Sequence, residues 1–90
     1  MISKDFMIRN SLGLHARPSA QLTQVAARYQ SEVFIAKNGR RVNAKSIMGV
    51  MMLAAGPGAT VTVDAEGIDE QQAVNAIGVL IESGFGDPHG

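Results

Sequence analysis

The Asn38-Gly39 dipeptide constrains the fold of this chain more tightly than any other feature of the sequence. It separates two runs of β-type residues, 32–37 and 40–44. An Asn-Gly pair readily adopts the two positive φ angles of a two-residue hairpin turn, and between β-like runs it is the strongest local hairpin signal. We therefore predict an antiparallel hairpin over 32–44, around which the other elements must pack.

The spacing of apolar residues predicts the other elements. Residues 1–9 and 60–66 alternate as strands do, and 16–29 carries apolar residues at the spacing of an amphipathic helix. The apolar segment 47–55 predicts a short helix of about two turns, which Gly56-Pro57-Gly58 ends. A further buried stripe predicts a helix near the C-terminus and consists of Ala73, Val74, Ile77, Leu80 and Ile81.

Several residues mark where these elements begin, end and face. Pro18 is tolerated only in the first helical turn and biases Arg17 away from helical dihedrals, so the first helix begins at residue 16 or residue 18. Asp69 with Gln72 matches a capping box for the last helix, and Gly84 suits the position after its end. In 60–66 the alternation places three residues inward and three outward: Val61, Val63 and Ala65, then Thr60, Thr62 and Asp64.

The predicted order is strand–helix–strand–strand–helix–strand–helix. A chain of 90 residues is the length of one domain, so we treat 1–90 as a single domain. Four strands with three helices bury their apolar surfaces most simply as two layers. We predict an α+β open-faced β-sandwich, with a four-stranded antiparallel sheet and three helices on one face.

Charge and composition exclude several classes of function. Eight basic residues balance eight acidic ones, which leaves no electrostatic footprint for nucleic acid or an anionic membrane surface. The chain has no Cys, and therefore neither disulfides nor a thiolate metal site. Charge follows too soon after Met1 for a secretory signal, and 47–55 is far shorter than the ~20 residues of a membrane span. We expect a cytoplasmic protein without membrane insertion.

His15 stands where the first strand-like stretch gives way to the first predicted helix. A helix start presents unpaired N–H groups and a partial positive charge, which together attract an anion. The same partial charge disfavours a cationic imidazole and favours a neutral, nucleophilic ring. Arg17 offers a planar fork for phosphate oxygens only two residues later, where a cation is otherwise poorly placed. This combination favours a site that carries a phosphoryl group over an ordinary structural histidine.

Two segments resemble the signatures of a known family. Gly13-Leu14-His15-Ala16-Arg17-Pro18-Ser19 resembles the active-site signature of the HPr family, the histidine-containing phosphocarrier proteins of the phosphoenolpyruvate-dependent sugar phosphotransferase system. Asn43-Ala44-Lys45-Ser46-Ile47-Met48-Gly49-Val50-Met51 resembles the second signature of the family, which surrounds a regulatory serine. The similarity covers essentially the whole chain, including the order of elements and the separation of the two motifs.

The resemblance implies a role for each residue of the first motif. His15 is expected to carry the phosphoryl group on Nδ1, with phosphorylated enzyme I as donor and enzyme IIA proteins as acceptors. The Arg17 side chain and the N–H groups of Ala16 and Arg17 are expected to compensate its charge. The chain has no acidic cluster for a catalytic metal and no Walker-type loop, so we predict no cofactor and a carrier rather than an enzyme.

Ser46 supports two interpretations that are compatible. Serine is a preferred helix N-cap, and the resemblance also makes Ser46 a site for regulatory phosphorylation by an HPr kinase/phosphorylase. Methionines at helical spacing are more often core than interface, but the resemblance assigns Ile47, Met48 and Met51 to a docking patch beside His15. Val50 and Leu53 then face the core.

Other functions stay open at this point. One is a regulatory, nitrogen-type phosphorelay or interaction module, because 82–87 resembles the ending of that branch, while the Ser46 region resembles the sugar branch. Gln24 and Ala27 stand where some members of the family carry lysines for partner contact, which leaves the charge complementarity to partners open. Another is a small-anion binding domain without a transfer role. No obligate interface is evident, so we expect a monomer.

The remaining charged residues suggest no further site. We interpret Lys37, Arg40 and Arg41 as a solvated edge that discourages strand pairing. His89 lies in a tail that we expect to be loose, and we assign it no function.

Overall fold

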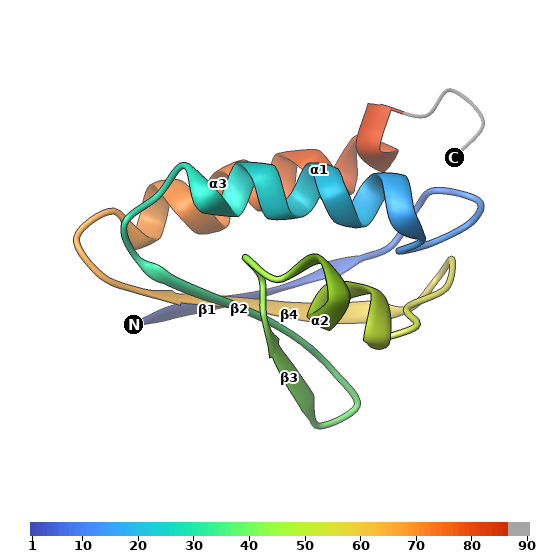
Figure 1. Cartoon of the computed structure of the whole chain (residues 1–90), viewed down its shortest axis with the longest axis horizontal. Helices are drawn as coiled ribbons and strands as arrows, with labels where there is room; N and C mark the ends of the chain where they lie inside the picture. The colour runs from blue at the N-terminus through green and yellow to red at the C-terminus, as the bar shows by residue number, and fades with distance from the viewer. Residues whose placement is uncertain (87–90) are drawn as a thin grey trace.

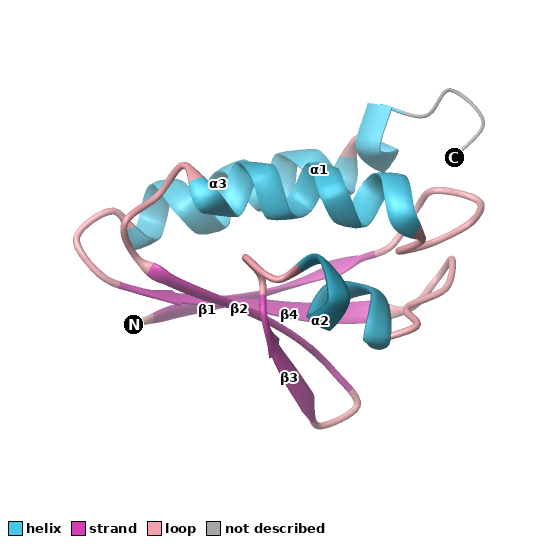
Figure 2. Ribbon diagram, viewed as in Figure 1, coloured by secondary structure: helices cyan, strands magenta, loops and turns pink. Residues whose placement is uncertain are grey.

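The computed structural model describes residues 1–86, and it has two layers (Figure 1). Helices α1 and α3 lie side by side across one face of a four-stranded sheet, and α2 packs against α1 and β3 (Figure 2). The predicted open-faced α+β sandwich is thereby confirmed. The elements in chain order are β1 (Ile2–Met7), α1 (Ala16–Ala27), β2 (Glu32–Lys37), β3 (Arg40–Asn43), α2 (Ile47–Met52), β4 (Thr60–Glu66), α3 (Glu70–Glu82) and a 3₁₀ turn, η1 (Gly84–Gly86).

The strands lie in the order β1-β4-β2-β3, and every pair is antiparallel. The predicted hairpin joins β2 to β3, with Lys37 opposite Arg40. Asn38 and Gly39 both have positive φ, 51° and 84°, as a tight hairpin turn of this kind requires. The hairpin places β3 at one edge of the sheet, while β1 forms the other edge.

The inner face of β4 is as predicted, but its outer face is not simply solvated. Val61, Val63 and Ala65 are buried, and so is the outward-facing Asp64, which is 7% exposed. The Arg41 guanidinium covers it, with Nη2 at 2.6 Å and Nε at 3.2 Å from the two carboxylate oxygens. The same guanidinium lies 3.7 Å from the centre of the Phe34 ring.

Arg40 and Arg41 are exposed on the edge strand β3, as predicted, but the basic side chains of this hairpin also make specific contacts. Besides the ion pair of Arg41, Lys37 Nζ donates to the Ala54 carbonyl at 3.2 Å, and Arg40 Nη1 donates to the Met52 carbonyl at 3.1 Å. The carbonyls at the end of a helix lack intrahelical partners and attract cations. The β2–β3 hairpin thus holds the end of α2 against the sheet.

Helices α1 and α2 both end earlier in the chain than apolar spacing predicts. Helix α1 begins at residue 16, because His15 is an extended N-cap residue, and it ends at Ala27 rather than residue 29. Helix α2 ends at Met52 rather than residue 55, since Ala54 adopts a positive φ of 51° that an α-helix cannot continue. Apolar residues beyond the end of each helix still pack into the core, which is why the hydrophobic pattern of the sequence continues past the last helical residue.

The predicted capping box of α3 is also wrong. Asp69 makes no side-chain cap, and Gln72 is exposed. The Asp69 carboxylate instead accepts hydrogen bonds from the N–H groups of Gln30 and Ser31, both at 2.9 Å, and from the Ser31 hydroxyl. The Gly67 N–H, which precedes the helix, donates to Glu70 at 3.0 Å. Asp69 therefore ties the loop after α1 to the start of α3.

The end of α3 agrees with the sequence. Gly84 follows Ser83, the C-cap residue, with a positive φ of 69°, as predicted for the position after a helix. His89 lies outside the described residues. Within residues 1–86, none of the helices has the length and apolar character that crossing a membrane demands.

We predict that Asp69→Asn lowers stability in a pH-dependent way. Hydrogen bonds from the Ser31 hydroxyl and the Gln30 N–H lower the pKa of Asp69 in the folded chain. A carboxyl group with a lowered folded pKa stabilises the fold above its unfolded pKa, about 4, and this stabilisation is lost as the pH falls through the folded value. Urea midpoints of variant and wild type should therefore differ at pH 7 and converge in acid. Glu82→Gln, an exposed carboxyl on α3, is the control. A difference in urea midpoint between variant and wild type that stays constant with pH would show that the Asp69 carboxylate is not the cause.

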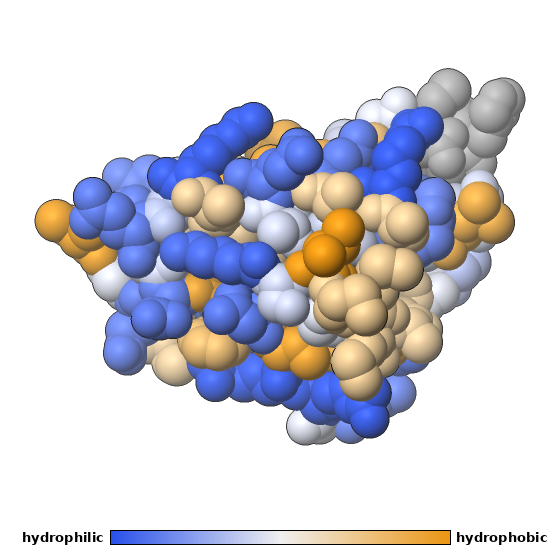
Figure 3. Space-filling model, viewed as in Figure 1, coloured by the Kyte–Doolittle hydropathy of each residue, from blue (hydrophilic) through white to orange (hydrophobic). Residues whose placement is uncertain are grey.

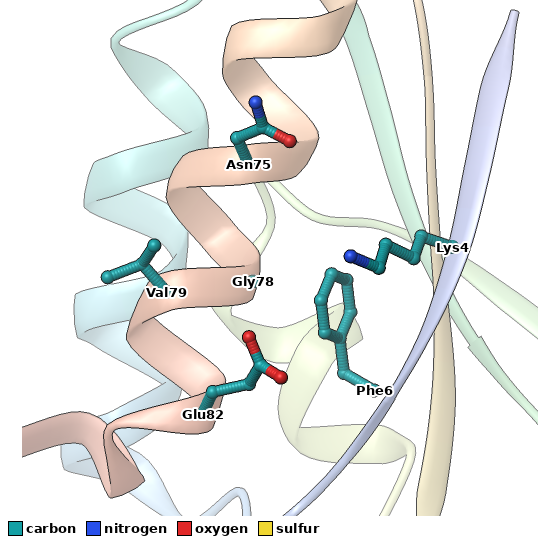
Figure 4. Close-up of a pocket in the computed structure, with 6 residues that line it drawn as sticks. All are labelled: Lys4, Phe6, Asn75, Gly78, Val79 and Glu82. Carbon is teal, nitrogen blue, oxygen red and sulfur yellow. The ribbon is translucent and has the colours of Figure 1, made fainter.

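We also predict that Gly78→Ala destabilises the protein, although alanine is the better helix former. Gly78 packs against the Phe6 ring in the lining of a groove of about 280 Å³ between β1 and α3 (Figure 4), and an added Cβ would collide with that ring. Helix propensity favours alanine by about 1 kcal/mol, but overpacking costs about 1–3 kcal/mol. We expect a net loss of about 1 kcal/mol in urea unfolding, which should vanish in a Phe6→Leu background. If the Gly78→Ala protein is more stable than wild type, the Phe6 ring moves aside without cost and the prediction is wrong.

Candidate functional site

His15 lies at the start of α1, where the chain leaves an extended loop and enters the helix (Figure 1). Its φ of −84° and ψ of −168° make it the N-cap residue, and its side chain makes no capping hydrogen bond. The residue is half-buried, between a buried Leu14 and an exposed Ala16. The imidazole is thus held at the surface beside the positive end of a helix, as the sequence predicts.

The first turn of α1 leaves two backbone donors unpaired. The Ser19 N–H donates to the His15 carbonyl at 3.0 Å, and Pro18 has no N–H to donate. The N–H groups of Ala16 and Arg17 have no acceptor among residues 1–86. These two donors directly follow His15 in the chain, an arrangement that can receive the oxygens of an anion.

The Arg17 side chain adds a free positive charge to this end of the helix. It is exposed, the first turn of α1 carries no acidic residue, and no carboxylate forms an ion pair with Arg17 within the described part of the chain. A cation without a partner near a helix N-terminus is unfavourable unless an anion joins it. The two amides and the Arg17 guanidinium are thus without a protein partner among residues 1–86.

A contact between two distant loops fixes the loop that precedes His15. The Leu14 N–H donates to the Ala55 carbonyl at 2.9 Å, and Gly13 passes so close to Ala55 that any Cβ on it would collide with the carbonyl oxygen. Gly13 also has a positive φ of 67°. Glycine is therefore required at this position on two grounds, conformation and space. The segment after α2 thereby supports the loop that carries the histidine.

Sequence reasoning missed Asn10, a residue of the loop before α1. The side chain is 1% exposed, and its Nδ2 donates to the Gly13 carbonyl at 2.7 Å. Ser19 adds a second internal bond, from its hydroxyl to the Leu14 carbonyl at 3.2 Å. Asparagine is common in turns and loops, so the sequence contains no signal that Asn10 is buried.

Ser46 caps α2, as one of its two interpretations predicts. Its Oγ accepts the Gly49 N–H at 3.1 Å, and the residue is exposed. Helix α2 packs beneath α1 (Figure 1), so the helix that Ser46 caps and the helix that His15 precedes are neighbours.

The surface of α2 is apolar where it meets solvent. Ile47, Met48 and Met51 are exposed, while Val50 and Leu53 are buried, in agreement with the predicted division of this helix. Figure 3 shows apolar side chains gathered over α2. Met52 and Leu12 are exposed to 60% and 69% and add apolar surface that the sequence analysis did not assign. Such surface is typical of docking sites for proteins.

A metal site is not apparent among the described residues. Residues 1–86 contain no cluster of three or more His, Cys, Asp or Glu side chains able to hold a metal ion. The groove between β1 and α3 (Figure 4) contains none of the predicted site residues.

Comparisons with known proteins agree with this arrangement. A family model described as the PTS HPr component phosphorylation site matches residues 2–83. The phosphocarrier protein HPr of Cupriavidus necator is 56% identical over 87 residues, which are 97% of this chain and 98% of that protein.

Two solved structures extend this likeness to the fold. HPr-C-His from Thermoanaerobacter tengcongensis is 45% identical, with a TM-score of 0.93 over 97% of this chain and 98% of that one. The catabolite repression protein Crh of Bacillus subtilis, described as a domain-swapped dimer, is 43% identical with a TM-score of 0.75, over 93% and 97%. With a family match over residues 2–83 and relatives this similar, the chain belongs to the HPr family of phosphocarrier proteins of the phosphotransferase system.

Proposed function

We propose that this protein accepts a phosphoryl group on Nδ1 of His15 from phosphorylated enzyme I and passes it to enzyme IIA proteins. The N–P bond forms as the bond from phosphorus to the donor breaks, and the reverse exchange delivers the group to the acceptor. The observation that carries this proposal is the half-buried His15 at the N-cap of α1, next to two unpaired N–H groups.

The role of the chain in this transfer is positioning and charge compensation. A phosphoryl group on His15 brings negative charge to the helix N-terminus, where the Ala16 and Arg17 amides and the Arg17 side chain can receive its oxygens. Phosphoryl transfer requires in-line approach and electrostatic stabilisation more than covalent machinery. The partner proteins supply the remaining groups, so the chain acts as a carrier, not as a free-standing enzyme.

The exposed residues Ile47, Met48 and Met51 form the proposed docking patch for these partners. A phosphate on Ser46, added by an HPr kinase/phosphorylase, would place about two negative charges at the edge of this patch. It would weaken the docking of an acidic partner and so regulate the relay.

A regulatory relay is the alternative. Crh, a relative in the same fold, is named for catabolite repression. Sugar uptake and binding to regulators in a deletion strain distinguish the two. A monomer in the cytoplasm stays our prediction for this chain, with Crh as the example of a relative that dimerises.

We predict that the wild-type protein, incubated with phosphoenolpyruvate and enzyme I, gains one acid-labile, base-stable phosphate. His15→Ala should gain none while unfolding at the same urea concentration within error, because His15 makes no capping bond. Arg17→Gln should still be labelled but lose about tenfold in rate, since one charge-assisted contact is worth about 1.5–3 kcal/mol. Labelling of His15→Ala at the wild-type rate would refute the proposal.

We predict that Ser46→Asp raises the KM of phosphorylated enzyme I for this protein about tenfold, through charge beside the docking patch. Ser46→Asn is the matched control, because asparagine caps a helix as well as serine and adds no charge. It should leave KM near the wild-type value. If Ser46→Asp accepts phosphate as efficiently as wild type, the link between Ser46 and docking is wrong.

A further inference from the structure

Asn10 is a buried polar side chain that the proposed transfer does not use directly. It is 1% exposed, and one of its two polar groups, Oδ1, has no hydrogen-bond partner among residues 1–86. Leaving a buried acceptor unpaired is unfavourable, and native proteins seldom tolerate it without a compensating role. The single hydrogen bond that the side chain does make therefore points to that role.

The acceptor of that hydrogen bond is a backbone carbonyl two residues before His15. Asn10 Nδ2 donates to the Gly13 oxygen at 2.7 Å, and the same oxygen accepts the His15 N–H at 3.0 Å. In return the Gly13 N–H donates to the Asn10 carbonyl at 3.2 Å. Asn10 thus closes the loop 10–13 from both sides and shares an acceptor with the backbone of His15.

The same peptide is held from the opposite side. Gly13 abuts Ala55, and the Leu14 N–H donates to the Ala55 carbonyl at 2.9 Å. The Gly13–Leu14 peptide is therefore held by Asn10 at its carbonyl and by Ala55 at its N–H. If the Asn10 bond is lost, only the Ala55 side of this peptide stays fixed, so the carbonyl that accepts the His15 N–H can tilt, and the direction of the His15 backbone changes with it.

We propose that Asn10 is a positioning residue for His15: its amide, acting through the Gly13 carbonyl, holds the His15 backbone in the N-cap conformation from which the imidazole meets a phosphoryl group. A donor is required there, which explains why a carboxamide is present although its oxygen is unpaired. This inference rests on the proposed function of His15 and adds a residue to it that does not touch the transferred group.

The test uses two replacements of similar size that lack the donor, Asn10→Asp and Asn10→Leu. An ionised aspartate accepts hydrogen bonds but cannot donate them, and leucine neither donates nor accepts them. The matched control is Ser31→Ala, which removes a buried polar group at the opposite end of α1. Phosphorylation by enzyme I is measured for kcat and KM, and hydrogen exchange of the His15 amide is measured in the free protein at pH 7.

Both Asn10 variants should lose about tenfold or more in kcat, since small misplacement of a reacting group is costly, while KM stays within about twofold because the docking patch is untouched. Exchange of the His15 amide should accelerate about tenfold. Ser31→Ala should change neither quantity. Wild-type kcat and exchange in both variants, or equal losses in Ser31→Ala, would overturn the inference.

The two proposals fail in different ways in this experiment. A wild-type protein that takes no label on His15 refutes the proposed function and, with it, a role for Asn10 in transfer. A labelled wild type with unaffected Asn10 variants refutes only the inference about Asn10. The exchange measurement shows independently of transfer whether Asn10 controls the His15 backbone.

Discussion

The close approach of Gly13 to Ala55 is the contact on which the candidate site depends. It joins the loop before α1 to the segment after α2, two parts of the chain about 40 residues apart, through a Leu14 hydrogen bond and a space that only glycine can occupy. Together with the packing of α2 on α1, it fixes the N-terminus of α1 relative to α2. The loop that carries the proposed acceptor residue is thereby tied to the helix that carries the proposed docking patch.

Cation-to-carbonyl bonds extend this arrangement to the sheet. The β2–β3 hairpin presents Lys37 and Arg40 to the carbonyls of Ala54 and Met52, just beyond and at the end of α2. These bonds satisfy acceptors that a short helix leaves open. A helix of six residues is too short to be stable alone, so its packing on α1 and its capping by the hairpin hold it in place.

The comparison between sequence and structure separates local from distant causes. The Asn38-Gly39 hairpin, the Ser46 cap and the position of Gly84 were predicted correctly, because each depends on the dihedral preferences or hydrogen bonds of adjacent residues. Asp69 is the N-cap residue of α3 as predicted, but its capping hydrogen bonds were predicted wrongly, because its carboxylate accepts instead from Gln30 and Ser31, which lie 39 and 38 positions away. Arg41 is exposed, as predicted, but its contacts could not be predicted, because Asp64 and Phe34 become its neighbours only in the sheet.

The sequence by itself determined the element order, the inward faces of the strands and the place of His15 at a helix start, since backbone preferences and hydrophobic spacing act over a few residues. Only the tertiary structure decided that α1 begins at residue 16, that its first two amides stay unpaired, and that Asn10 is buried against Gly13. Those outcomes depend on hydrogen bonds to residues that are distant in the sequence. Such residues become neighbours only when the sheet and helices pack, so no short segment of the sequence predicts them.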